Sequence, residues 1–408
     1  MTDFSKKTNN TSKSASLETT AVAELIEIEK LGLTRSLKEV GGPQEPLVQI
    51  GNKNVLLFCS NNYLGLANHP EVTKAAIEST MRYGASSVSS RLISGHMTPH
   101  AELEDLLAKW KGVEAALVFS TGFQANIGII TSLLTRDDIV ISDELNHASI
   151  IDGCRLSRAN VEIFRHGDMN HLEDVLNSSA RRPGRRLVVT ESIFSMDGDR
   201  APLRDLVSLA KRHGAWTMVD EAHAVGIFGN NGAGLVRDLG LTDSVDIQIG
   251  TLGKALGSFG AYVAGSSSLI KLLTNRARSF IFTTGLPPSC AAAAAKAINI
   301  CMREPERAAT LLQRARKIGE DLREAGLNIP HIDSQILPIL IGDSRETVKA
   351  AENLLRRNIY VAAIRPPTVP TDTARLRLSL MASHEKSHIE KLLTELPSCM
   401  EEARLDSK

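Results

Sequence analysis

The chain has 408 residues, which is enough for one large domain and a smaller one at roughly 100–200 residues per domain. Hydrophobic residues make up 42% and charged residues 23%, as in an ordinary globular protein, and 47 basic side chains balance 47 acidic ones. A net charge of zero argues against nucleic acid or an anionic membrane as a partner, and 4% aromatic residues are too few for a base-stacking surface. No apolar run approaches the roughly 18 residues that a membrane span needs.

The N-terminus is polar and lacks the apolar centre of a signal peptide, so we expect a disordered tail over residues 1–20. Residues 21–57 are expected to form a helix and a hairpin that lead into the first domain. The five cysteines are scattered, with no CxxC pair, which argues against disulfides and a zinc site. We therefore expect a cytoplasmic protein without a structural metal.

Residues 58–295 are predicted to form a large α/β domain. Near its start, TPHAELEDLLAKWKG predicts a helix that Thr98 can cap, with Pro99 in its first turn. Between residues 113 and 265, short apolar runs then alternate with helical patterns, which predicts a mainly parallel sheet covered on both faces. These runs are EAALVF, DIVIS, VEIF, RLVVT, AWTMVD, DIQIG and AYVAG. Residues 296–408 change to long helices with a few strands, which predicts a smaller α+β domain.

Polar residues follow two of these strands, where a sheet of this kind binds its ligands. Ser120, Thr121 and Gly122 follow AALVF and open a helix whose free N–H groups suit a phosphate, although Ser-Thr-Gly is also a common helix cap. Asp220 ends AWTMVD, with His223 three residues later, and a capping aspartate is the ordinary alternative. The letters DEAH also match a helicase box, but the upstream GxxxxGK[ST] motif that a helicase needs is missing.

Lys254 stands in the small-residue turn GTLGKALGSFG, directly after the run DIQI. Lysines usually lie on exposed helix faces, so a lysine in this turn indicates a functional role. An amine near a buried aspartate and a phosphate site suits a Schiff base with a pyridoxal cofactor. Asp220 would keep the pyridine nitrogen protonated, and the glycines would let the backbone approach the ring.

Eight segments together resemble the α-oxoamine synthase family of fold-type I pyridoxal-phosphate enzymes. They run in the family's order over most of the chain from about residue 30: SNNYLGL (60–66), RLISGHMTPHAELE (91–104), STGFQAN (120–126), NHASIIDG (146–153), ESIFSMDGD (191–199), VDEAHAVGIFG (219–229), TLGKALGSFG (251–260) and FTTGLPP (282–288). The resemblance implies an aspartate-aminotransferase-like fold, with a large domain on a mainly parallel sheet and a small C-terminal α+β domain. It also implies pyridoxal 5′-phosphate as cofactor.

The resemblance assigns roles around this cofactor. Lys254 matches the Schiff-base lysine, Asp220 the partner of the pyridinium, and His223 the hydrogen bond to the phenolic oxygen. His147 matches the histidine that stacks on the ring and orients the acyl group. The positions near the ring or its phosphate are Gly122, Phe123, Ser195, Thr251 and Thr284. Of these, Thr284 matches a hydroxyl that reaches the cofactor of a second subunit, which implies a homodimer with its active site at the interface.

Three further residues match substrate positions. Arg365 resembles the arginine that holds the amino-acid carboxylate, for which a guanidinium offers two parallel hydrogen bonds, and Thr368 resembles a substrate contact in the same loop. Arg35 lies about where the family has an arginine for the acyl substrate, although an ordinary surface arginine fits nearly as well.

Residues 363–385 are most similar to the family members that make 8-amino-7-oxononanoate for biotin synthesis. The implied reaction is a decarboxylative Claisen condensation of L-alanine with pimeloyl-CoA or a pimeloyl carrier protein, releasing the thiol and CO₂. Two alternatives stay open: a sister enzyme that joins glycine or serine to another acyl-CoA, and a non-catalytic scaffold on the same fold. Serines and a valine replace glycines of many relatives in YGASSVSSR (83–91), which leaves the acyl chain undetermined.

Overall fold

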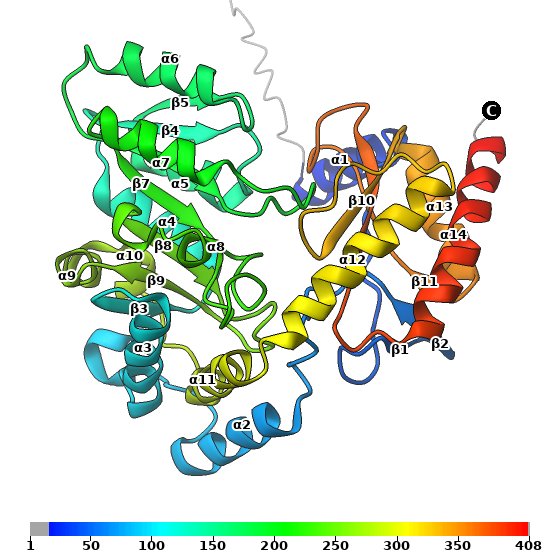
Figure 1. The fold of residues 1–408 in the computed structure, drawn as a ribbon, viewed down its shortest axis with the longest axis horizontal. Helices are drawn as coiled ribbons and strands as arrows, with labels where there is room; N and C mark the ends of the chain where they lie inside the picture. The colour runs from blue at the N-terminus through cyan, green and yellow to red at the C-terminus, as the bar shows by residue number, and fades with distance from the viewer. Residues whose placement is uncertain (1–15, 407–408) are drawn as a thin grey trace, which may run out of the picture.

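The computed structural model describes residues 16–406, and its centre is a seven-stranded sheet (Figure 1). The strand order is β3-β9-β8-β7-β6-β4-β5, and all neighbours are parallel except β9, which runs antiparallel to β3 and β8. The strands are β3 (Ala115–Phe119), β4 (Ile139–Asp143), β5 (Asn160–Phe164), β6 (Arg186–Glu191), β7 (Trp216–Asp220), β8 (Ile247–Thr251) and β9 (Ala261–Gly265). Each predicted apolar run forms one of these strands, so the prediction of a mainly parallel sheet is confirmed.

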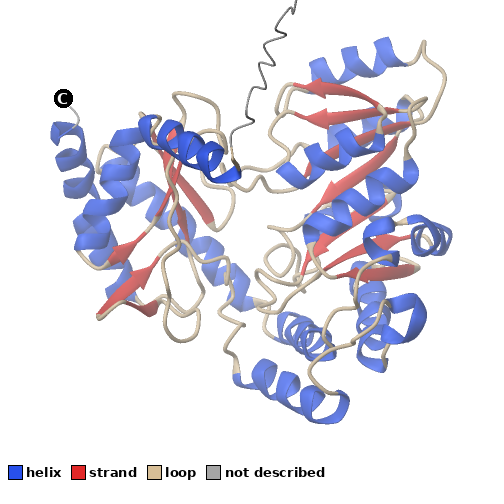
Figure 2. Cartoon of the chain, turned by 180° about the vertical axis from the view of Figure 1, so that it is seen from behind, coloured by secondary structure: helices blue, strands red, loops and turns tan. Residues whose placement is uncertain are grey.

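Helices cover both faces of this sheet, as Figure 2 shows from behind. Side chains alternate along a strand, so Ile139 and Ile141 belong to one buried cluster and Val140 to the other. The first cluster includes residues of α3 (Thr98–Lys111), α6 (Met169–Ser179), α7 (Leu203–Arg212), α8 (Leu235–Asp238) and α11 (Pro288–Arg303). The second includes residues of α4 (Gly122–Leu133), α5 (Ala148–Ser157), α9 (Ser267–Arg276) and α10 (Arg278–Ile281).

The helix α3 begins at Thr98, as predicted, but Thr98 is not its cap. Met97 is the cap residue, and its N–H donates to the Nδ1 atom of His100 over 3.0 Å. The histidine three residues into the helix therefore closes its first turn, a role that the sequence pattern did not indicate. Helix α2 (Pro70–Tyr83) and two short helical turns, η1 (Arg91–Gly95) and η2 (Thr242–Ser244), complete this part of the chain.

The C-terminal part forms a second, antiparallel sheet in the order β10-β13-β12. Its elements are α12 (Glu306–Glu324), β10 (Ile336–Gly342), α13 (Ser344–Arg356), β11 (Ile359–Tyr360), β12 (Ala362–Ile364), β13 (Ala374–Ser379) and α14 (Lys386–Asp406). The predicted N-terminal hairpin, β1 (Leu47–Ile50) and β2 (Lys53–Leu57), pairs through β2 with β11. The hairpin therefore lies beside the C-terminal elements, as Figure 1 shows.

Two expected segment boundaries cross observed helices. Helix α1 (Leu17–Lys30) begins inside the stretch 1–20 that we expected to be a tail, of which residues 1–15 lie outside the described part of the chain. The boundary expected between residues 295 and 296 falls within α11. Within residues 16–406, no helix combines the length and the apolar character that crossing a membrane requires.

Candidate active site

Lys254 lies in a tight turn after β8, half-buried against the end of the sheet. The turn is closed by the N–H of Gly257, which donates to the Lys254 carbonyl over 2.9 Å. Gly257 has φ +59°, and a Cβ atom there would lie 2.3 Å from the backbone nitrogen of Ala67. Only glycine fits this position, three residues after the lysine.

The Lys254 amine contacts the imidazole of His223. Its Nζ lies 2.8 Å from His223 Nε2, and His223 Nδ1 lies 2.7 Å from the Tyr63 hydroxyl. Burial lowers the pKa of Lys254 to about 8, although the charges of Asp220 and Glu191 oppose this shift. Burial, together with the charges of Lys254 and Arg377, also lowers the pKa of His223 well below its usual value. The imidazole is therefore neutral, and the lysine can act as a base near neutral pH.

Asp220 ends β7 and is buried beside this pair. Its Oδ1 accepts the N–H of Ala222 over 2.9 Å, and its Oδ2 accepts the amide of Asn126 over 2.9 Å. Asn126 belongs to α4 and also reaches Ser149 of α5, so three elements fix the carboxylate. The structure thus gathers Lys254, His223 and Asp220 at one edge of the sheet, as the sequence predicted.

His147 caps α5 at the same edge. Its ring Nδ1 lies 2.7 Å from the Ser149 hydroxyl, and its main-chain N–H donates to Oε1 of Glu191 over 2.7 Å. Part of the ring is exposed, yet the surrounding protein and the charge of Lys254 lower its pKa, against the attraction of Asp220. The bond to Glu191, which stands in register with Asp220 on the neighbouring strand, places His147 beside this carboxylate pair.

Sequence reasoning assigned no role to Glu191, the last residue of β6. It is buried, and it stands in register with Asp220 on the neighbouring strand. Burial and the nearby charge of Asp220 raise its pKa to about 8. The sequence did contain a signal for Glu191. It is a carboxylate at the end of the apolar run RLVVT and at the start of the segment ESIFSMDGD.

The start of α4 offers free backbone donors. Thr121 caps the helix by accepting the N–H of Gln124 over 3.1 Å. In the described chain, the N–H groups of Gly122 and Phe123 make no hydrogen bond with protein, and a Cβ atom on Gly122 would meet nothing within 4 Å. Two unpaired amides at an open helix start suit a phosphate. Together with a lysine of lowered pKa and a buried aspartate, they fit pyridoxal phosphate.

The other predicted cofactor residues surround this region. The Thr251 hydroxyl donates to the Gly260 carbonyl over 3.1 Å, beside the Lys254 turn. The Thr284 carbonyl accepts the Ser120 hydroxyl over 3.3 Å, which brings Thr284 to the start of α4 with its side chain exposed. Ser195 lies in the loop after β6, where its carbonyl accepts Nε of Arg377 over 2.6 Å.

Sequence reasoning missed Arg377. Its guanidinium contacts Tyr63, which in turn contacts His223. The arginine is buried on β13, and its guanidinium reaches the Tyr63 hydroxyl over 3.3 Å and the Ser379 hydroxyl over 2.7 Å. The predicted Arg365 instead donates to the carbonyls of Gly32 and Thr34 over 2.7 and 2.6 Å. Its role in holding a carboxylate stays a prediction.

The three predicted substrate residues, Arg35, Arg365 and Thr368, line one cavity of about 440 Å³. Apolar side chains such as Val361 and Ile364 form part of its wall, and Lys38 adds a further cation. The structure therefore brings these three residues together. Lys254, His223 and Asp220 do not line this cavity.

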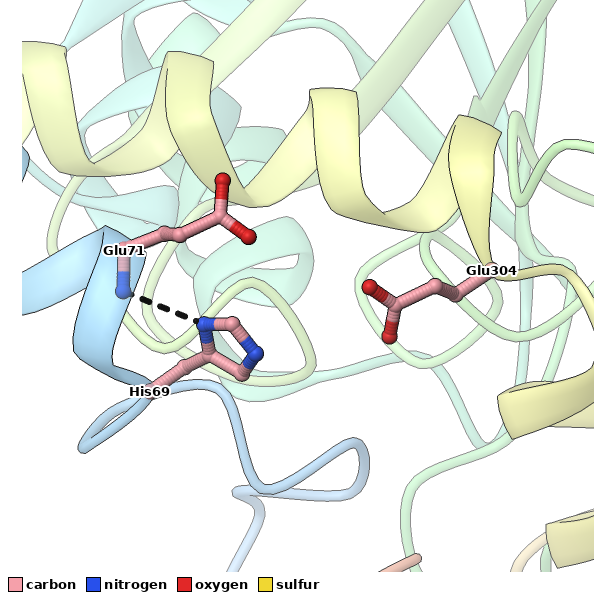
Figure 3. Close-up of side chains that lie close together, drawn as sticks. All are labelled: His69, Glu71 and Glu304. Carbon is pink, nitrogen blue, oxygen red and sulfur yellow. Dashed lines mark hydrogen bonds between the residues drawn. The ribbon is translucent and has the colours of Figure 1, made fainter.

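A second group of polar side chains, His69, Glu71 and Glu304, has ligand atoms within 4.8 Å of one another (Figure 3). His69 caps α2 by accepting the N–H of Glu71 over 3.3 Å. Both carboxylates already pair with arginines, Glu71 with Arg303 over 2.5 Å and Glu304 with Arg307 over 2.6 Å. Helix capping and ion pairing account for the group.

The model of the family described as aminotransferase class I and II matches residues 53–396. The chain belongs to this family. It is 48% identical to the 8-amino-7-oxononanoate synthase of Anaeromyxobacter dehalogenans strain 2CP-1, over 93% of this chain and 94% of that protein. It is 49% identical to the synthase of the same name from Geobacter sulfurreducens, over 90% and 94%.

A solved structure of another enzyme has the same fold as this chain. It is a serine palmitoyltransferase variant from S. paucimobilis with a bound PLP–myriocin aldimine, similar with a TM-score of 0.89 and 33% identity over 95% of this chain and 98% of that one. The prediction of a fold-type I enzyme architecture is therefore confirmed.

Proposed function

We propose that this protein is a pyridoxal-phosphate-dependent acyltransferase that condenses L-alanine with a pimeloyl thioester to give 8-amino-7-oxononanoate and CO₂. The observation that carries the proposal is the 2.8 Å contact of Lys254 with a neutral His223, beside a buried Asp220 and two unpaired helix amides. Relatives of 48–49% identity that bear the name of this synthase support the choice of substrates and a place in biotin synthesis.

Each part of the cofactor has residues that would hold it. Lys254 would bind its aldehyde carbon, Asp220 its pyridine nitrogen and His223 its phenolic oxygen, with His147 on the ring face. The amides of Gly122 and Phe123 would bind its phosphate, with Ser195 and Thr251 close by. When bound, the cofactor supplies an electron sink for bonds broken at Cα of the amino acid.

The protein's own groups then move the protons. Lys254, with a pKa near 8, is neutral in a substantial fraction of molecules near neutral pH and can take the Cα proton. It can return a proton to the same carbon after CO₂ has left. The neutral His223 accepts a hydrogen bond from the lysine, and the N–H groups of Ala222 and Asn126 hold the carboxylate of Asp220 in place.

Arg377 is the better candidate for the carboxylate of the amino acid, in place of Arg365. A chain of contacts of 3.3, 2.7 and 2.8 Å runs from Arg377 through Tyr63 and His223 to Lys254. We therefore assign the carboxylate to Arg377 at one end of this chain of contacts and the proton transfer to Lys254 at the other. The cavity lined by Arg35, Arg365 and Thr368 then suits the far carboxylate of the acyl chain, with Arg35 as its cation.

A second copy of the chain completes the site in this proposal. Apolar side chains are exposed around the start of α4 and the loop that carries Thr284: Val88, Leu92, Ile93, Phe123 and Phe282. Ser90 and Thr284 form a β-bridge, so the two loops that carry most of these side chains lie side by side. An apolar surface of this kind suits a protein interface. The exposed Thr284 hydroxyl would then face the partner's cofactor.

The test uses purified protein saturated with pyridoxal phosphate, a panel of amino acids and a panel of acyl thioesters. We expect thiol release with L-alanine and a pimeloyl thioester, and a product with the mass of 8-amino-7-oxononanoate. Turnover with glycine or serine and another thioester instead would favour a sister enzyme. Borohydride reduction followed by peptide mapping should place the cofactor on Lys254.

The matched variants are Lys254→Ala and Lys271→Ala, the second removing an exposed lysine on α9. Lys254→Ala should abolish turnover and the reducible linkage, while Lys271→Ala should keep both. An unmodified Lys254 after saturation with the cofactor and reduction would overturn the proposal and favour a non-catalytic scaffold.

A further inference from the structure

The loop 192–201, between β6 and α7, contacts both the large sheet and the C-terminal part of the molecule. On the side of the large sheet, the N–H of Ser192 donates to the Asp220 carbonyl over 2.8 Å. On the side of the C-terminal sheet, Arg377 donates to the Ser195 carbonyl over 2.6 Å, and the Ser334 hydroxyl donates to the Gly198 carbonyl over 2.7 Å. The placement of Arg377 relative to Asp220 therefore depends on this loop.

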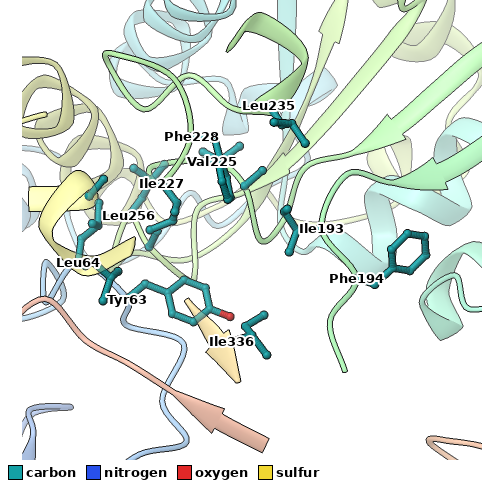
Figure 4. Packing of buried hydrophobic residues seen from close by; sticks show 14 of the residues in the cluster. Tyr63, Leu64, Ile193, Phe194, Val225, Ile227, Phe228, Leu235, Leu256 and Ile336 are labelled. Carbon is teal, nitrogen blue, oxygen red and sulfur yellow. The ribbon is translucent and has the colours of Figure 1, made fainter. Parts of the chain in front are cut away.

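The loop also packs into the buried core between the two parts. Ile193 and Phe194 belong to the same hydrophobic cluster as Tyr63 and Ile336, as Figure 4 shows. Asp197 forms an ion pair with the buried Arg375 of β13. These contacts fix the start and the middle of the loop, and a separate contact holds its other end, near Asp199.

His166, which follows β5, holds that other end between two carboxylates. Its Nδ1 lies 3.0 Å from Oδ1 of Asp143, at the end of β4, and its Nε2 lies 2.8 Å from Oδ2 of Asp199, in the loop. Ionised carboxylates only accept hydrogen bonds, and a neutral imidazole has a single N–H. Both contacts are hydrogen bonds only when the histidine is a charged imidazolium.

The surroundings of His166 favour this charge. Burial opposes it, but the hydrogen bonds and charges of Asp143 and Asp199 outweigh burial and raise the pKa of His166 to about 10. The other oxygen of Asp199, Oδ1, is buried without a hydrogen-bond partner among the described residues, so His166 is its only counter-charge in contact. The centroids of the Phe194 and His166 rings lie 4.3 Å apart with the rings nearly perpendicular, and Glu144 accepts the main-chain N–H of His166 over 2.8 Å.

We infer that His166, as an imidazolium bound to both Asp143 and Asp199, is a positioning residue that anchors the loop 192–201 and through it sets the place of Arg377. The inference rests on the proposed function, because it assigns the anchored arginine to the amino-acid carboxylate. Among the described residues, the imidazole of His166 has no hydrogen bond to Lys254, His223 or Asp220, so we assign its effect on Arg377 to the loop.

The kinetic test compares His166→Gln with His171→Gln in the full chain loaded with pyridoxal phosphate. Glutamine cannot carry the charge that both aspartates need. His171, in the first turn of the following helix α6, is the control, since its Nδ1 accepts the main-chain N–H of Arg165 over 2.9 Å and its imidazole has no carboxylate partner among the described residues. We expect His166→Gln to raise KM for the amino acid by about 10- to 100-fold, with KM for the thioester unchanged. His171→Gln should leave both within twofold.

A second readout needs neither cofactor nor turnover. The pKa of His166 is raised on folding, so its stabilisation is fully present below about pH 6.5 and is lost as the pH rises through about 10. The difference in Tm between the wild type and His166→Gln should therefore be largest near pH 6 and shrink towards pH 10. Asp199→Asn, which keeps the volume of the side chain, should give a smaller difference of the same sign and pH dependence.

A Tm difference that stays constant from pH 6 to 10, or an unchanged KM for the amino acid, would overturn the inference. If the wild type turns over no substrate pair, the proposed function fails by itself. The pH dependence of Tm in the ligand-free protein still decides whether the imidazolium anchors the loop.

Discussion

Replacing Arg377 by leucine tests which arginine holds the carboxylate of the amino acid. The guanidinium of Arg377 spends two of its donors on short bonds, to the Ser195 carbonyl and the Ser379 hydroxyl. Its remaining contacts, with Asn61 over 3.4 and 3.5 Å and with Tyr63 over 3.3 Å, are long. A carboxylate can replace these long contacts with two charge-assisted hydrogen bonds.

The expected loss follows from those two bonds. Hydrogen bonds to a charged group contribute about 1.5–3 kcal/mol each, so losing the pair costs about 3 kcal/mol or more, or roughly a hundredfold in Kd. We would titrate L-alanine and L-alaninamide into the cofactor-loaded protein and follow the absorbance of the cofactor. Arg377→Leu should weaken alanine by this factor and leave the amide, which has no carboxylate, within a few-fold.

Arg365→Leu is the matched comparison, because its guanidinium bonds the carbonyls of Gly32 and Thr34 and makes no contact with Tyr63 or His223 among the described residues. It should leave the preference for alanine over the amide unchanged. The reasoning would be refuted if Arg365→Leu erased this preference while Arg377→Leu kept it. Arg377→Lys retains the charge but not the two parallel donors. Comparing its Tm with that of Arg377→Leu shows how much of any effect comes from the lost bond to Ser195.

Three further predictions concern groups outside the substrate contacts. Lys111→Met leaves the fully buried Glu221 without its cation, so urea unfolding should show a loss of about 3–5 kcal/mol, and adding Glu221→Gln should restore part of it. The pKa of Glu191 is raised on folding to about 8, so its protonated form stabilises the fold below about pH 4.5 and this stabilisation is lost towards pH 8. Glu191→Gln should therefore gain stability over the ligand-free wild type by about 1 kcal/mol per pH unit across that window, and a difference independent of pH would contradict the shift. Arg158, the C-cap of α5, is exposed with φ +63°, so Arg158→Gly should relieve about 1–2 kcal/mol of backbone strain, partly offset by about 0.5–1 kcal/mol of glycine entropy, and a fall in Tm would contradict this.

The large sheet was predictable because its strands are buried on both faces. A run such as RLVVT is apolar at every position that meets a helix layer, and β6 is buried along nearly its whole length. The pairing of β2 with β11 was not predictable, since Leu56 and Ile359 lie far apart in sequence and nothing local marks either as a partner. The position of Lys254 was predictable because the Gly257 turn has a local sequence signature.

The choice between Arg365 and Arg377 shows where such local signals end. Along β13, Arg375 and Arg377 alternate with Leu376 and Leu378, and the leucines pack into the main hydrophobic cluster. The same alternation is ordinary for an exposed strand, where the arginines would face water. Here both arginines are buried and turn to the loop 192–201, because β13 is covered on its polar face as well. A buried guanidinium needs anionic or carbonyl partners, so that cover, which is set by the packing of the two parts of the molecule, turns an ordinary pattern into a candidate carboxylate site.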